Sequence, residues 1–403
     1  MKKTLAAVAV LGAFAGPALA ADVQLYGIVD TGVRYLHSDL DIGNADVGSK
    51  LNYDATDKFS MESGMQSGSR FGFKGTEEIG NGLTVGFILE SQFSSDTGAL
   101  HADGFFRREA SLFLQGNFGK FAMGRIGSMN GGVSSWAKHG VMSAFGTSWG
   151  SYAANADNIF GNSGIWNNTI AYETPDFAGF KVFAQYGMGN SKGDYSVENE
   201  SSSDRYYGIG ASYENGPLSL FLSVDFINYA SWDGENATDT DDAWTVRFGG
   251  NYDFEVVKLY AGVSYFDEAK LSNYSGALTD RVNYEDKNLL PGMKMQGWSL
   301  GLSASIPVAG GNVLLGAAYL DAEAADSVAT AFTGGQAHRS EAFKNADFTR
   351  WIVSAGYDYP LSKRTNVYGV VTYNQDSVEY NQDYMKDEDP TVFGVMVGLR
   401  HRF

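Results

Sequence analysis

The segment Thr391–Phe403 constrains the fold of this chain more than any other part of the sequence. Its apolar residues Phe393, Val395, Val397 and Leu399 alternate with glycine, methionine and arginine. A period of two gives a β-strand one apolar and one polar face. At the edge of a soluble sheet such a strand would invite aggregation. In a closed transmembrane β-barrel its apolar face meets lipid and its arginine face meets water, and we adopt this interpretation.

The first twenty residues have the pattern of a secretory signal peptide. Lys2 and Lys3 precede an apolar run from Leu5 to Phe14, and Ala18–Ala20 supplies the small residues of a cleavage site. We therefore predict a signal peptide at residues 1–20 and a mature chain at residues 21–403. An uncleaved membrane anchor is the alternative.

Composition agrees with an exported barrel. The net charge of −18 becomes −20 once the two lysines of the signal are removed (−18 − 2), and this charge would repel nucleic acid. Cysteine is absent, and the mature chain has no apolar window of about 18 residues that could form a transmembrane helix. The 50 glycines, 26 phenylalanines and 23 tyrosines, against seven prolines, suit a barrel with aromatic girdles.

Short alternating segments recur along the whole mature chain and are joined in turn by tight turns and long polar loops. Asn81-Gly82 is typical of a hairpin turn. The predicted strands are Val23–Leu36, Gly68–Glu77, Leu83–Phe93, Phe105–Gly116, Lys120–Ile126, Ile165–Glu173, Phe180–Met188, Arg205–Glu214, Leu218–Tyr229, Ala243–Asp253, Val256–Phe266, Gly297–Ile306, Asn312–Leu320, Phe348–Tyr359, Asn366–Tyr373 and Thr391–Phe403. This count predicts an all-β, 16-stranded antiparallel transmembrane barrel, which is wide enough for an aqueous lumen.

Arginines fall on the polar face of these strands, opposite residues such as Phe248 and Trp351. They either set the ion preference of a pore, or hydrogen-bond inside the barrel and contact lipid phosphates at its rims. The residues predicted to face the lumen are Arg34, Arg247, Arg350, Arg400 and Arg402.

Several motifs resemble the general diffusion porins of Gram-negative bacteria. They are spread over the whole mature chain. The motifs are Val23–Gly27, Ser69–Glu77, Gly80–Leu83, Gly116–Lys120 with Gly124-Arg125, and Gly398–Phe403. The resemblance implies an outer-membrane location and a homotrimer surrounded by lipid and lipopolysaccharide. It also implies that the third external loop folds into the barrel, and that Phe403 addresses the chain to the outer-membrane assembly machinery.

By the same resemblance, residues 127–164 form the constriction loop, and basic residues on the opposite wall face it. Arg70 and Lys74 occupy positions where the family places lumen cations, and the alternation with Phe71 and Phe73 agrees. Arg108 occupies another such position, although the neighbouring Arg107 leaves open which of the two points inward. Asp157 is the only acid of the loop, so the predicted constriction consists of Arg70, Lys74, Arg108 and Asp157.

Two departures from the family pattern weaken a transverse field across the pore. The family commonly carries an arginine just before the Asn167-Asn168-Thr169 stretch, where this chain has Ile165. The loop also reads Ser143–Thr147 where the family has Pro-Glu-Phe-Gly-Gly. The negative charge of the chain predicts a preference for cations, whereas a basic constriction predicts a preference for anions. Because Ile165 stands where the family has an arginine, we expect a preference for cations.

Three further groups of residues have two interpretations each. Six aromatics in or beside the loop offer a track for sugars or pin the loop to the wall: Trp136, Phe145, Trp149, Tyr152, Phe160 and Trp166. The acids at 233–242 and 383–389 bind divalent cations or form solvated loops; the first run lacks the glycine and the distal glutamate of a calcium site. Ser143, His139 and Asp157 are the nearest approach to a catalytic set, but no catalytic or cofactor motif is present.

We therefore expect an outer-membrane porin through which small hydrophilic solutes and ions diffuse passively, with no cofactor, no bound metal and no enzymatic activity. A substrate-specific channel for a sugar or another small solute is the first alternative. An outer-membrane enzyme or adhesin is the second, and it would show no steady conductance.

Overall fold

The computed structural model describes residues 22–39, 56–101, 104–189, 197–231, 241–270, 274, 294–325, 346–379, 387 and 389–403. The predicted signal peptide lies outside these residues, as do most of the predicted acidic clusters.

Seventeen β-strands form one antiparallel sheet. They are β1 (Gln24–Asp39), β2 (Thr56–Ser63), β3 (Arg70–Gly80), β4 (Leu83–Gln92), β5 (Glu109–Gly116), β6 (Gly119–Gly127), β7 (Ile165–Glu173), β8 (Phe180–Gly187), β9 (Arg205–Asn215), β10 (Leu218–Asn228), β11 (Ala243–Asp253), β12 (Lys258–Lys270), β13 (Lys294–Val308), β14 (Gly311–Ala324), β15 (Asp347–Pro360), β16 (Thr365–Glu379) and β17 (Thr391–Arg402). A 3₁₀ helix, η1 (His139–Met142), and a short α-helix, α2 (Ala156–Phe160), lie between β6 and β7.

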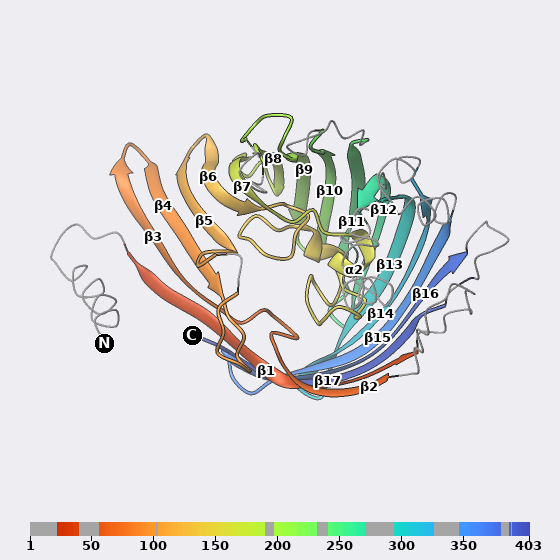
Figure 1. Cartoon of the computed structure of the whole chain (residues 1–403). Coiled ribbons are helices and arrows are strands. Elements are labelled where there is room, and N and C mark those ends of the chain that lie inside the picture. The colour runs from red at the N-terminus through yellow and green to blue at the C-terminus, as the bar shows by residue number, and fades with distance from the viewer. Residues whose placement is uncertain are drawn as a thin grey trace, which may run out of the picture.

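Strand β1 closes the sheet into a barrel. One of its edges pairs with β17, from Ile28 opposite Arg402 to Asp39 opposite Thr391. Its other edge pairs with β3 near its start and with β2 farther along. Because β2 and β3 follow each other along one edge of β1, the seventeen strands occupy sixteen positions (17 − 1). The predicted 16-stranded antiparallel barrel is confirmed, and Figure 1 shows the strands as a ring around the segment that carries α2.

All sixteen predicted strands are present. The prediction was wrong for residues 56–63, which fall in the connection predicted between Leu36 and Gly68 but form a strand. They form β2, which pairs with Thr31–Ser38 of β1, and β1 itself runs past the predicted end at Leu36. Only Phe59 and Met61 carry the apolar alternation of β2, and both are exposed. Two residues are too few to reveal a strand by periodicity alone.

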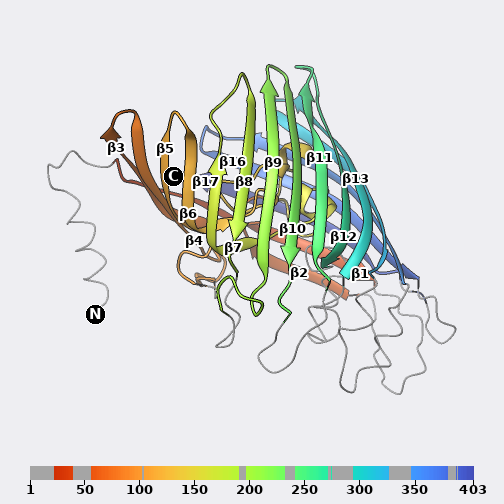
Figure 2. The same cartoon turned by 90° about the horizontal axis from the view of Figure 1, so that it is seen from above.

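The two ends of the barrel differ in their connections. Seven short turns join strands at one end, and eight longer connections lie at the other. Figure 2 shows the short hairpins gathered at one end of the strands. Short periplasmic turns and long external loops are typical of outer-membrane barrels.

The outer and inner faces of the strands differ as the alternation predicts. In β13, Trp298, Leu300 and Leu302 are exposed, whereas Ser299 between them is buried. An exposed apolar belt of this kind is stable only against lipid. The buried polar residues of each strand therefore mark the inner face of the barrel, on which the functional site lies.

Candidate functional site

Residues 128–164, called loop 3 below, lie inside the barrel. Three inward hydroxyls of the wall bond to the backbone of the loop. The hydroxyl of Ser303 accepts from the Ala144 N–H (2.9 Å), and that of Ser354 accepts from the Ala154 N–H (2.9 Å). The hydroxyl of Thr372 donates to the Tyr152 carbonyl at 2.6 Å. These hydroxyls lie on β13, β15 and β16, on the faces opposite the exposed apolar residues, so loop 3 covers this part of the inner wall.

Several glycines lie in the wall beneath the aromatic side chains of loop 3. A Cβ atom on Gly262 would lie 2.7 Å from the ring of Phe160, and one on Gly316 would lie 2.9 Å from the ring of Phe145. Gly301 likewise faces Phe160. These glycines allow the loop aromatics to approach the strand backbone closely. They also account for part of the high glycine content of the chain.

The aromatics of loop 3 pin the loop rather than lining a path for solutes. All six that the sequence analysis singled out are at least 94% buried: Trp136, Phe145, Trp149, Tyr152, Phe160 and Trp166. Phe145, Trp149 and Phe160 belong to one apolar cluster with inward residues of β14–β17. A sliding surface for sugars would need aromatic faces open to the lumen, so the geometry favours the pinning interpretation.

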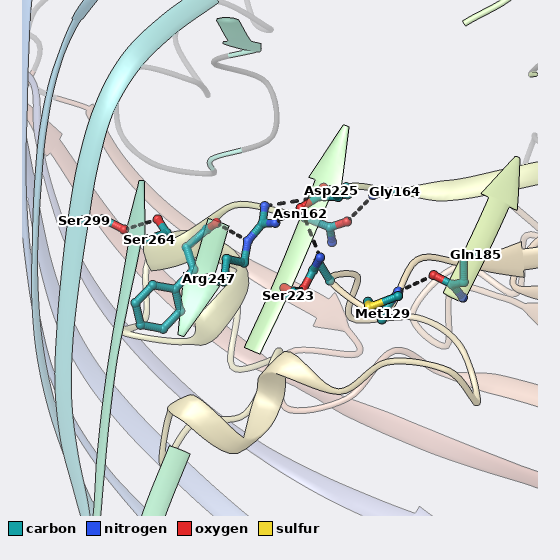
Figure 3. A network of polar contacts seen from close by, with 12 residues as sticks. Met129, Asn162, Gly164, Gln185, Ser223, Asp225, Arg247, Ser264 and Ser299 are labelled. Carbon is teal, nitrogen blue, oxygen red and sulfur yellow. Dashed lines mark hydrogen bonds and ion pairs between the residues drawn. The ribbon is translucent and has the colours of Figure 1, made fainter. Parts of the chain in front are cut away.

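A buried polar network ties both ends of loop 3 to β10 and β11 (Figure 3). The guanidinium of Arg247 forms an ion pair with Asp225, and its Nε donates to the Phe160 carbonyl at 2.8 Å. Asp225 also accepts from Asn130 (3.1 Å), near the start of the loop, and from the hydroxyl of Ser163, near its end. Asp225 and Arg247 together therefore bind both ends of loop 3: Asn130 near its start, and Phe160 and Ser163 near its end.

Other contacts in Figure 3 extend this network along the wall. The Met129 N–H donates to Oε1 of Gln185 at 2.8 Å, and the hydroxyls of Ser264 and Ser299 lie 2.7 Å apart. Tyr274 packs its ring near Gly161 and Phe266. Burial raises the pKa of the Tyr274 phenol, so this group stays neutral beside the ion pair.

The opposite wall carries an arginine cluster, consisting of Arg70, Arg107, Arg108 and Arg125. Oε1 of Glu90 on β4 accepts from Nε of Arg108 at 2.6 Å, and its Oε2 lies 3.6 Å from Nε of Arg70. Oε1 of Gln92 accepts from Nη1 of Arg107 (3.1 Å) and from Nη1 of Arg108 (3.3 Å). Glu90 therefore lies between the guanidiniums of Arg70 and Arg108, and Gln92 joins Arg108 to Arg107.

The arginine cluster shows which way Arg107 and Arg108 point, which the sequence left open. It also includes Arg125, which was not predicted to line the constriction. Both Arg107 and Arg108 reach Gln92, so the side chains of both turn toward the inner face of β4. Arg125 donates to the Arg107 carbonyl at 2.6 Å and to Asn167. A bulge between Gly124 and Ile126 interrupts the β6–β7 ladder. Alternation cannot give the direction of a side chain at a bulge.

The remaining predicted constriction residues lie apart from the Arg70–Glu90–Arg108 group. Lys74 is exposed, with its Nζ 5.3 Å from the centre of the Tyr26 ring. Asp157 accepts from Nε2 of His139 at 2.7 Å and from Nδ2 of Asn162 at 2.6 Å, both within loop 3. The carboxylate of Asp157 thus has two partners within its own loop.

The five arginines predicted to face the lumen have different surroundings. Arg247 and Arg350 are buried in ion pairs, the latter with Asp376 at 2.5 Å. Arg34 pairs with Glu62 at 2.6 Å, and Nε of Arg400 donates to Asn366 at 2.9 Å. Arg402 is exposed next to the final residue. Burial and pairing remove Arg247 and Arg350 from contact with passing solutes.

Glu109 holds loop 3 to the wall beside the arginine cluster. Its carboxylate accepts from the backbone N–H and the hydroxyl of Ser135, each at 2.9 Å, and from the hydroxyl of Ser111 at 2.8 Å. Loop 3 is therefore fixed at both sides of the lumen.

The catalytic alternative has the wrong geometry in loop 3. The hydroxyl of Ser143 donates to the Ala154 carbonyl at 2.7 Å, whereas His139 faces Asp157. Within the described ranges, no group of three or more histidine, aspartate or glutamate side chains is placed to hold a metal ion. None of the helices in these ranges has the length and apolar character needed to cross a membrane.

Sequence comparison places this lumen in a known family. A sequence model described as Gram-negative porin matches residues 6–378. The chain belongs to the Gram-negative porin family. An outer membrane porin protein of Bordetella pertussis is 32% identical, and outer membrane porin protein 32 of Delftia acidovorans is 30% identical; in both cases the similarity covers 100% of each chain.

Solved porin structures share the barrel. The anion-selective porin from Comamonas acidovorans is 27% identical and matches with a TM-score of 0.63, over 95% of this chain and 100% of that one. The outer membrane channel DcaP of Acinetobacter baumannii matches in fold alone, with 14% identity and a TM-score of 0.57 over 95% of this chain and 97% of that one. This porin is therefore an outer-membrane channel for passive diffusion of small solutes, and its relatives are channels rather than enzymes.

Proposed function

We propose that this porin prefers anions and small anionic solutes, and that the arginine cluster sets the preference. The observation that carries the proposal is the charge around Glu90 on the wall facing loop 3, where this one carboxylate has the guanidiniums of both Arg70 and Arg108 within 3.6 Å. Fixed positive charge in a narrow aqueous path raises the local concentration of anions. Lys74 adds an exposed cation to the same wall, on β3.

Loop 3 supplies little negative charge to oppose the cluster. Asp157 is its only acid, and the carboxylate is bonded to His139 and Asn162. The proposal reverses the expectation of a cation preference, which rested on the net charge of the chain and on Ile165 in place of the family's arginine. Charge at the narrowest part of a pore acts on each passing ion, whereas distant charge is screened within about 10 Å at 0.1 M salt. The similarity to a porin described as anion-selective supports the same sign.

The proposal is tested by substituting an arginine of the cluster and, separately, the glutamate that it faces. In planar bilayers with a KCl gradient, Arg70→Gln should move the zero-current potential toward cation preference, and Glu90→Gln should move it the other way. Arg364→Gln is the matched control, because it removes one exposed cation from the β15–β16 turn. Zero-current potentials that stay at the wild-type value in both Arg70→Gln and Glu90→Gln would overturn the proposal.

The assembly of the protein is part of the same proposal. Residues 1–20 act as a cleaved signal, and the mature barrel forms a homotrimer in contact with lipid and lipopolysaccharide, without enzymatic activity. Phe403 serves as the signal to the assembly machinery. In support, its backbone exchanges two hydrogen bonds with Gly27, at 3.0 and 3.1 Å, so the last residue forms part of the seam that closes the barrel.

A further inference from the structure

Residues 64–69, between β2 and β3, leave the barrel wall and are called the inward bend below. Strand β1 pairs Thr31 with Ser63 and Ile28 with Arg70. Six residues, 64–69, therefore stand opposite two residues of β1. The chain here is four residues longer than a regular ladder requires (6 − 2).

The inward bend enters the lumen and meets loop 3. Met65 is 5% exposed and belongs to the apolar cluster that includes Trp149 of loop 3 and Tyr368 of β16. Gln66 is also buried, and its amide donates to Oδ2 of Asp358 at 3.0 Å, on β15. The bend therefore crosses in front of β1 and β17 and bonds to strands beyond them.

Asp30, on the inner face of β1, holds the bend. Its carboxylate accepts from the N–H groups of Gln66 (3.0 Å) and Ser67 (2.7 Å), and from the hydroxyl of Tyr368. The hydroxyl of Ser69 accepts from the Asp30 N–H at 3.1 Å. Hydrogen bonds to a carboxylate are among the stronger ones in proteins, and this residue is fully buried.

Glycines let the bend turn and fit. Gly64 has a φ of +72°, which favours glycine. A side chain on Gly32 would overlap Met65, and a Cβ on Gly68 would lie 3.2 Å from Nη1 of Arg108. The bend thus contacts loop 3 through Met65 at one end and approaches the arginine cluster through Gly68 at the other.

We propose that the inward bend is a second constriction segment, which together with loop 3 fixes where the passage narrows and how wide it is. Asp30 is the positioning residue of this segment. The bend fills the space between Trp149, in the middle of loop 3, and the wall at Arg108, so solutes pass on the far side of it. The inference uses the channel function of the family and does not depend on the proposed ion preference.

The proposal can be tested by a deletion whose length follows from the pairing of β1 with β2 and β3. Removing Met65–Gly68 takes out the four additional residues and gives β1 one continuous partner strand. The single-channel conductance of the native oligomer in KCl should rise by about 1.5-fold or more, since a wider path carries more ions. Liposomes containing the variant should also admit larger neutral sugars than liposomes containing the wild type.

A point variant covers the case in which the deletion variant does not fold. Met65→Ala removes most of the Met65 side chain from the apolar cluster that includes Trp149 and should also raise the conductance, whereas the volume-conserving control Met65→Leu should leave the conductance unchanged. Folding is checked by circular dichroism and by gel mobility without heating. Wild-type conductance and sugar exclusion in folded Met65→Ala, or in the folded deletion variant, would overturn the proposal. The zero-current potential is recorded separately, because its sign tests only the ion preference.

Discussion

Replacement of Arg247 by methionine should loosen loop 3 without changing the barrel strands. Arg247 is 2% exposed and joins Asp225 to the Phe160 carbonyl, so its loss leaves a buried carboxylate without its cation. Methionine keeps most of the side-chain length and adds no charge. The variant therefore removes the electrostatic tie and little of the packing.

The size of the effect follows from the burial of the pair. Removing one partner of a buried ion pair costs about 3–5 kcal/mol. At about 1.4 kcal/mol for each tenfold change, the ratio of docked to released loop falls by roughly two to three and a half orders of magnitude. Phe160 and Phe145 still pack on the glycine wall, so we expect brief releases of the loop rather than permanent opening.

Single-channel recording measures this directly. Arg247→Met should show increased current noise and frequent transitions between conductance levels, and the barrel should unfold at a lower temperature than the wild type. The double variant Arg247→Met/Asp225→Leu is the control, because removing both charges avoids the unpaired carboxylate and should recover part of the lost stability. A quiet channel with wild-type heat stability in Arg247→Met would refute the role assigned to the ion pair.

Two further predictions concern packing and assembly. Gly262→Ala should displace loop 3 and alter the single-channel conductance at a cost of about 1–3 kcal/mol, because its Cβ would lie 2.7 Å from Phe160. Gly369→Ala is the control, since its Cβ would meet its nearest neighbour at 3.5 Å; equal conductance in the two variants would contradict the prediction. Phe403→Ala should lower the amount of folded protein in the outer membrane, measured by fractionation and unheated gels, because the backbone bonds to Gly27 remain and only the ring is lost. Wild-type amounts would count against the proposed role of the Phe403 side chain in assembly.

The strands could be predicted because each has one face toward lipid and one toward the interior. Apolar and polar residues therefore alternate along the sequence of the strand. The prediction failed at β2, where only Phe59 and Met61 mark the outer face. The position of loop 3 inside the barrel came from a family resemblance. No local pattern in residues 128–164 specifies the distant glycines and hydroxyls to which the loop binds.

The site was predicted less completely than the fold. Alternation gave the face on which Arg247 and Arg350 lie, but not their burial against Asp225 and Asp376, which are partners on neighbouring strands. The direction of Arg125 depends on a bulge, and the inward bend depends on the carboxylate of Asp30. Gly64 and Gly68 lie within the bend and are its only visible sequence signal.

The zero-current potential of the purified wild-type protein across a KCl gradient tests the central claim most directly. The arginine cluster predicts a potential of the sign given by chloride moving faster than potassium, with a conductance that rises steadily with salt concentration. A potential of the opposite sign, with steady conductance from the same preparation, would contradict control of the passage by the arginine cluster.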